Sequence, residues 1–252
     1  MAYRYDTDLA FLGELSNENL GKLFEILVYD PEDNEKRLTE TLSISEEYRR
    51  YGSDYTQYWR RIAEELQLFG GNSFFNFFRG SSGVLYNEIL CDVCDKMKVN
   101  YNKNSETTKI EQNLLMTVLE KALDDMTREE QEELAVSIGI KDFGRVNASV
   151  LTAAFLKLFN MGGFKSYQIT LLVVNAIWKA IFGRGLTLVA NATITRVASI
   201  LTGPIGWAVT GIWTAIDIAR PAYRVTIPSV LMVILLRQTY LNEDVLADLE
   251  IN

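Results

Sequence analysis

Residues 197–216 read VASILTGPIGWAVTGIWTAI and contain no charged side chain. A helix of this length is about 30 Å long, which matches the hydrocarbon core of a bilayer. The pair Gly203-Pro204 interrupts the run, and threonines lower its hydrophobicity. Because proline breaks a helix and glycine weakens it, we predict a buried hairpin of two apolar helices over residues 185–219 instead of a continuous membrane span.

The sequence around this run is basic. Residues 144–237 contain nine Lys and Arg but a single acid, Asp217, which gives the segment a net charge of +8. Since the whole chain carries −8, the remaining residues carry −16. A basic apolar segment joined to an acidic polar one is typical of a chain that meets a membrane or an acidic partner. Ion pairs between the two halves of one fold would explain the same pattern.

The rest of the chain also predicts helices, because prolines are few and good helix formers recur throughout. Apolar residues at spacings of three and four predict a helix over 46–69, ended by the pair Gly70-Gly71. A short helix is predicted over 37–43. Ser16 has the position of an N-cap, and Thr127 with Glu130 has the spacing of a capping box.

These patterns predict an all-α, multi-helix bundle. Its N-terminal half is acidic, and its basic apolar C-terminal bundle holds the buried helical hairpin. We divide the chain into a small N-terminal helical module (1–45), an acidic helical middle region (46–143) and a basic apolar helical region with an acidic tail (144–252).

The chain contains no histidine, which excludes Ser-His-Asp and Cys-His catalysis and histidine-liganded metal sites. Its two cysteines, Cys91 and Cys94, have the C-x-x-C spacing within EILCDVCDKM, which indicates the middle of a helix. A zinc site would need two more nitrogen or sulfur ligands, which this chain does not supply. A redox pair usually lies at the start of a helix, so we predict two core thiols.

Clustered acids, such as those in Glu129-Glu130-Gln131-Glu132-Glu133, are predicted to be solvated helix faces. We therefore predict no enzyme, no catalytic residues, no metal and no cofactor. The basic residues are dispersed and the whole chain is acidic, so a nucleic-acid partner is not predicted either.

Two sets of candidate functional residues follow from the hairpin. The apolar residues of the uncharged run would contact a membrane: Val197, Ile200, Leu201, Ile205, Trp207, Val209, Ile212, Trp213 and Ile216. Basic residues near the ends of the apolar helices would bind lipid head groups or a protein partner: Lys179, Arg184, Arg196, Arg220 and Arg224.

Four segments carry a resemblance to a known family: DTDLAFL (6–12), ELQLFGGNSFFNFFRG (65–80), IEQNLL (110–115), and the region 203–230 that begins GPIGW and ends PAYRVTIPSV. In order and spacing they resemble the YaaW-like family of uncharacterised bacterial proteins. The C-terminal part of that family has been likened to ubiquinol–cytochrome c chaperones. The resemblance implies a bacterial cytoplasmic origin and gives weak support to an assembly role, and it transfers no catalytic residues.

Two functions follow, and the sequence leaves both open. The first is a non-enzymatic, membrane-active protein that inserts its apolar hairpin into an anionic bilayer, as pore-forming defence or toxin effectors do. The second is a soluble chaperone-like or adaptor module that binds a protein partner and has no membrane activity. The first residues lack the pattern of a secretory signal, so we expect the bacterial cytoplasm, with peripheral or induced binding at the inner membrane. A homo-oligomer is compatible with either function.

Overall fold

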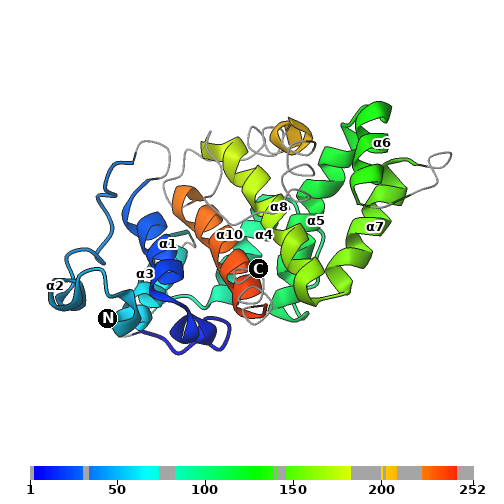
Figure 1. Ribbon diagram of the computed structural model, residues 1–252. Helices are drawn as coiled ribbons and strands as arrows, with labels where there is room; N and C mark the ends of the chain where they lie inside the picture. Colours follow the sequence, from blue (N-terminus) through cyan, green and yellow to red (C-terminus); the bar gives the residue numbers. More distant parts are fainter. Residues whose placement is uncertain are drawn as a thin grey trace, which may run out of the picture. The chain divides into compact units, whose positions relative to one another are not determined.

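The computed structural model describes residues 3–30, 34–73, 83–138, 140, 146–182, 200, 203–208 and 223–242. Within these residues every regular element is a helix, apart from an isolated antiparallel bridge between Tyr29 and Lys36 (Figure 1). The predicted all-α class is therefore confirmed. Most of the predicted hairpin over 185–219 lies outside the described residues.

Contacts within the chain define two compact units. Unit 1 consists of Met1–Ile110 with Asp217–Tyr240, and unit 2 of Glu111–Ile216 with Leu241–Asn252. The three-part division of the sequence into 1–45, 46–143 and 144–252 stays a prediction.

Unit 1 is built around α10 (Tyr223–Tyr240), whose residues 225–236 are all buried. Figure 1 shows this helix, in orange to red, beside α1 (Asn17–Val28), in blue. It also packs against α3 (Trp59–Ser73) and α4 (Tyr86–Lys96). A helix that is apolar on every side is stable in water only where other helices cover it. The apolar run in α10 is therefore the core of unit 1.

Short elements complete unit 1: the 3-10 helices η1 (Ala10–Glu14) and η2 (Tyr55–Tyr58), and α2 (Glu46–Tyr51). The continuous helix predicted over 46–69 is wrong, because the chain turns at Gly52, whose φ is +57°. The helix predicted over 37–43 is also wrong. Side-chain hydrogen bonds hold that segment as a loop, described below, and such bonds compete with those of a helix.

The end of α3 differs from the prediction as well. Gly70 and Gly71 do not end the helix, which continues to Ser73. A Cβ atom added to Gly70 would overlap the side chain of Ile89 on α4. The glycine therefore lets α3 and α4 approach closely, and its role is in packing instead of capping.

Unit 2 contains most of α5 (Thr107–Asp124), then α6 (Arg128–Ser137), α7 (Ala148–Asn160) and α8 (Gly163–Phe182). The predicted capping box of Thr127 and Glu130 is present at the start of α6. The helices α7 and α8 pack against each other. Gly162 and Gly163 join them with φ of +67° and +55°, a conformation that glycine adopts at little cost.

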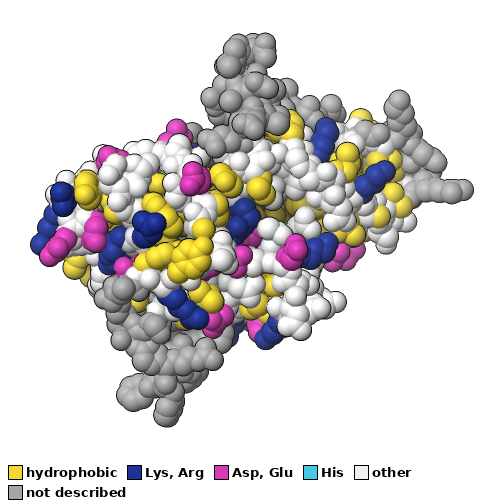
Figure 2. Space-filling model, turned by 90° about the horizontal axis from the view of Figure 1, so that it is seen from below, with side chains coloured by type: hydrophobic (Ala, Val, Ile, Leu, Met, Phe, Trp, Pro, Cys, Tyr) yellow, Lys and Arg dark blue, Asp and Glu magenta, His cyan; other side chains and the backbone are white. Residues whose placement is uncertain are grey.

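Figure 2 shows hydrophobic side chains exposed in patches on one face of the molecule, between Lys, Arg, Asp and Glu side chains. Within the part of the chain that the structure describes, no helix is both long and apolar enough to cross a bilayer.

Candidate protein-binding site at the 34–45 loop

Residues 34–45, called here the 34–45 loop, connect α1 to α2 in unit 1. Arg37 fixes the first part of the loop, and its side chain is only 7% exposed. Its Nε donates to the carbonyl of Ile26 at the end of α1, 3.2 Å away. Its Nη1 pairs with Asp30 at 3.2 Å, and Arg224 of α10 reaches the same carboxylate oxygen at 3.4 Å.

A proline in α10 explains the third contact of Arg37. Pro228 lies inside that helix and has no N–H, so the carbonyl four residues earlier, on Arg224, lacks its usual helical donor. The Nη2 of Arg37 donates to this carbonyl at 3.2 Å. A hydrogen bond from a charged donor thus replaces the one that the proline removes, and it ties the loop to the central helix of unit 1.

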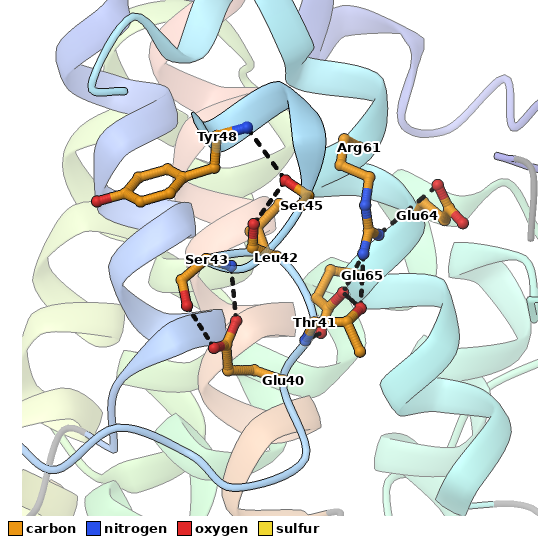
Figure 3. Close-up of polar contacts among 9 residues, drawn as sticks. All are labelled: Glu40, Thr41, Leu42, Ser43, Ser45, Tyr48, Arg61, Glu64 and Glu65. Carbon is orange, nitrogen blue, oxygen red and sulfur yellow. Dashed lines mark hydrogen bonds and ion pairs between the residues drawn. The ribbon is translucent and has the colours of Figure 1, made fainter. Parts of the chain in front are cut away.

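The middle of the loop is bound to α3 by a buried carboxylate (Figure 3). Glu65 is 1% exposed and accepts hydrogen bonds from the amide and the hydroxyl of Thr41, both at 2.7 Å. Arg61, one turn earlier on α3, pairs with Glu65 at 3.2 Å and with Glu64 at 3.6 Å. Burying a carboxylate costs several kcal/mol unless it is paired and hydrogen-bonded, and Glu65 meets both conditions.

A second buried carboxylate shapes the rest of the loop. Glu40 accepts from the amide of Ser43 at 2.8 Å and from its hydroxyl, and it pairs with Lys36 at 3.2 Å. Between these residues Leu42 is fully buried. Ser45 then caps α2, because its Oγ accepts from the amide of Tyr48 at 3.1 Å (Figure 3).

The same loop exposes two aliphatic side chains. Leu38 is fully exposed and Ile44 is 56% exposed, whereas Leu42 between them is buried. A single exposed leucine is ordinary on a protein surface. Here, however, both side chains extend from a backbone that Arg37, Glu40, Glu65 and Ser45 already hold in place. A partner that contacts them would therefore order little additional chain, which favours binding.

A second polar cluster of unit 1 is structural. Asp6 is buried and accepts from the amides of Asp8 at 2.9 Å and Tyr86 at 2.7 Å. Leu85 cannot cap α4 with its side chain, so Asp6 performs this role from a distant part of the sequence. Gln67 of α3 exchanges two hydrogen bonds with the backbone of Arg4, at 2.8 and 3.2 Å. Gln67 also donates to the carboxylate of Asp6 at 3.5 Å, so residues of two of the quoted segments, 6–12 and 65–80, meet in one network.

The protonation of Asp6 leads to a prediction about how the stability of the fold depends on pH. Burial raises the pKa of this carboxyl above its ordinary value of 3.8, despite its hydrogen bonds to Tyr86 and Asp8. The folded state therefore holds the proton of the Asp6 carboxyl more tightly than the unfolded state does. The stability gained from this proton is complete below pH 3.8 and is lost as the pH rises through the folded-state pKa. We expect Asp6→Asn to flatten the fall in unfolding free energy between about pH 4 and pH 7. Urea titrations of both proteins across this range test it, and parallel pH profiles would contradict it.

The described residues show no catalytic or metal centre. Both cysteines lie on α4 as free thiols, and Cys94 is buried, as predicted. Burial raises the pKa of the Cys91 thiol, which disfavours the reactive thiolate. Among the residues that the structure describes, no three His, Cys, Asp or Glu side chains are grouped to hold a metal ion.

The structure describes only some of the residues singled out from the sequence. Of the apolar set, Ile200 is half-buried, Ile205 is buried and Trp207 is exposed. The others lie outside the described residues: Val197, Leu201, Val209, Ile212, Trp213 and Ile216. Of the basic set, Lys179 is exposed and Arg224 pairs with Asp30, while Arg184, Arg196 and Arg220 are not described.

The 34–45 loop was missed from the sequence. The only signal available was the alternation of apolar and polar residues in RLTETLSIS, residues 37–45. That pattern does not distinguish the exposed Leu38 from the buried Leu42.

Comparison with known proteins identifies relatives along nearly the whole chain. A UPF0174 protein of Helicobacter pylori (strain J99) is 56% identical over 237 residues, which cover 94% of this chain and 93% of the relative. A second UPF0174 protein, from H. pylori strain 26695, is 46% identical and covers 79% of this chain and 97% of its own length. UPF0174 protein YaaW of Escherichia coli (strain K12) is 31% identical over 241 residues, 94% of this chain and 95% of the relative.

Two family models match the sequence. Residues 3–38 match a domain of unknown function, DUF3944, and residues 54–231 match the ubiquinol–cytochrome c chaperone model. No solved structure matches the chain.

These findings correct the first function predicted from the sequence. The prediction of a membrane-active, pore-forming protein is wrong: the matched family is one of chaperones, and no described helix could span a bilayer. The resemblance to YaaW-like proteins is confirmed by identity along nearly the whole length of both chains. The chain belongs to the UPF0174 family, which includes YaaW of E. coli, and through residues 54–231 to the ubiquinol–cytochrome c chaperone family.

Proposed function

We propose that this chain is a non-enzymatic, chaperone-like module of the bacterial cytoplasm that binds a protein partner. The proposal rests mainly on one observation: Leu38 and Ile44 are exposed on a loop that buried charged side chains hold in place. The family match supports the same class of function, since its members are described as chaperones. In this proposal the exposed aliphatic side chains contact the partner, and the buried carboxylates fix their positions.

The rigidity of the 34–45 loop matters because binding has to overcome the conformational entropy lost by the groups that it orders. Immobilising a long side chain at an interface costs about 0.5–1.5 kcal/mol, and ordering a loop costs more. The 34–45 loop is already ordered by Arg37 at its start, Glu65 in its middle and Ser45 at its end. The contacts made by Leu38 and Ile44 would therefore contribute more of their free energy to the binding affinity, because less is lost in ordering the loop.

Site-specific photo-crosslinking in cells tests this function. We expect a photoreactive phenylalanine analogue at position 38 or 44 to give one defined crosslinked protein, identifiable by mass spectrometry. Position 104 is the matched control, because Asn104 is also exposed on a loop of unit 1 but is polar. No crosslinked protein at 38 and 44, or the same products from all three positions, would contradict the proposal.

A further inference from the structure

Pro228 occupies a place in unit 1 where a proline is unfavourable. It is buried inside α10, where it removes one N–H from the helix and its ring crowds the preceding turn. Serine and threonine side chains can hydrogen-bond helical carbonyls, but the two beside this proline do not. Thr226 and Ser229 are fully buried, and their hydroxyls form no hydrogen bond within the described part of the chain. The carbonyl of Arg224 is bonded instead by Arg37, which lies 187 residues earlier.

Arg37 connects this carbonyl to the 34–45 loop through every nitrogen of its guanidinium group. Nε donates to the carbonyl of Ile26, Nη1 pairs with Asp30 and Nη2 donates to the carbonyl of Arg224, each at 3.2 Å. A planar group bound at three points has one orientation. The position of the next residue, the fully exposed Leu38, therefore depends on acceptors at the end of α1 and the start of α10.

We infer that Pro228 is a positioning residue for the 34–45 loop. By withholding the helical N–H from the Arg224 carbonyl, it keeps that acceptor for Arg37. A chain that breaks a local rule inside its core is expected to gain something elsewhere, and here the gain is the order of the loop. The inference rests on the proposed function, since it says what sets the conformation of the partner-binding loop.

An opposite response of helix and loop follows from this role. Alanine at position 228 would supply the missing N–H and has a higher helix propensity, so α10 would gain a hydrogen bond. The new N–H would compete with Arg37 for the same carbonyl, so the loop would lose part of its attachment. A residue that only stabilised the fold would affect both elements in the same direction.

Hydrogen–deuterium exchange of the full-length chain, followed by mass spectrometry, measures both responses. Several amides of the loop are hydrogen-bonded within unit 1 and report on its order: those of Thr41, Ser43 and Ser45. We expect Pro228→Ala to speed the exchange of residues 37–45 about fivefold or more, the effect of one lost hydrogen bond. Residues 229–236 of α10 should exchange no faster than in the wild type.

Val230→Ala is the matched control. It removes carbon atoms from the same buried helix without changing its N–H groups, so exchange in the loop should stay within about twofold of the wild type. Arg37→Met should speed exchange in the loop at least about fivefold more in the wild-type background than beside Pro228→Ala, because the shared contact is lost only once. Arg37→Lys keeps the charge but cannot bridge three acceptors, so it should act like Arg37→Met and tests the contact without changing Pro228.

Equal effects of Pro228→Ala and Val230→Ala on the loop would overturn the inference. Additive effects of Arg37→Met and Pro228→Ala, or wild-type exchange in Arg37→Lys, would do the same. Crosslinking at position 38 gives the functional readout: Pro228→Ala should lower the yield about fivefold or more, and an unchanged yield would contradict the role of Pro228. If the wild type gives no crosslink while the exchange data show the coupling, the proposed function fails and the link between Pro228 and the loop stands.

Discussion

Glu65→Ala is expected to lower the free energy of unfolding by about 3–5 kcal/mol, the range for breaking a buried ion pair on one side. The substitution removes the acceptor of both Thr41 hydrogen bonds and the shorter of the Arg61 ion pairs. It also leaves the guanidinium of Arg61 largely buried without its closest counter-charge. Urea denaturation followed by circular dichroism measures the loss.

Glu64→Ala is the matched control on the same turn of α3. Glu64 reaches Arg61 at the longer distance of 3.6 Å, and burial raises the pKa of its carboxyl. Its charged form is therefore poorly stabilised in the fold, and we expect its removal to cost at least about 1 kcal/mol less than the removal of Glu65. If Glu65→Ala and Glu64→Ala lowered the free energy of unfolding equally, Glu65 would not hold the loop as described.

Gly70→Val is expected to cost about 3 kcal/mol, the upper part of the range for overpacking a core. Even a Cβ atom at this position would overlap the side chain of Ile89, and valine adds two more carbons. The helices α3 and α4 would have to separate, which would disturb contacts along both. Thermal and urea unfolding of the variant measure the cost.

Two further variants make this prediction specific. Gly206→Val changes a helical glycine around which a Cβ would meet nothing within 4 Å, so stability should change by less than about 0.5 kcal/mol. Ile89→Ala removes the atoms that overlap, so Gly70→Val should cost at least about 1 kcal/mol less in its presence. Additive losses at positions 70 and 89 would contradict the packing explanation.

Local signals in the sequence predicted local structure well. Ser16 caps α1, and Thr127 with Glu130 forms a capping box, because each needs only residues within one turn. The predictions for 37–43 and for Gly70 failed for the opposite reason. In both, the decisive partner is far along the chain: Glu65 for Thr41, and Ile89 for Gly70.

The apolar C-terminal sequence was the most misleading feature. The uncharged run 197–216 suggested insertion into a bilayer, whereas the separate apolar run 225–236 in α10 is buried on all sides within unit 1. Composition does not distinguish a core helix from a membrane helix when neighbouring helices supply the apolar surroundings. Arg224 pairs with Asp30 of the acidic half of the chain, and its predicted role in binding head groups or a partner stays a prediction.

The candidate site was not predictable for a related reason. Leu38 and Leu42 are the same residue type four positions apart, but one is fully exposed and the other fully buried. The difference in their exposure comes from hydrogen bonds that fix the loop to α1, α3 and α10. These bonds involve Ile26, Glu65 and Arg224. None of these contacts follows from the spacing of residues within the loop.

The affinity of the crosslinked partner for the purified chain tests the central proposal most directly. Leu38→Asp/Ile44→Asp places charges on two exposed positions, so the unfolding free energy should stay within about 0.5 kcal/mol of the wild type. The proposal predicts that this variant binds the partner about 100-fold more weakly, a loss typical of interface hot spots. Unchanged affinity in a fully folded variant would contradict it.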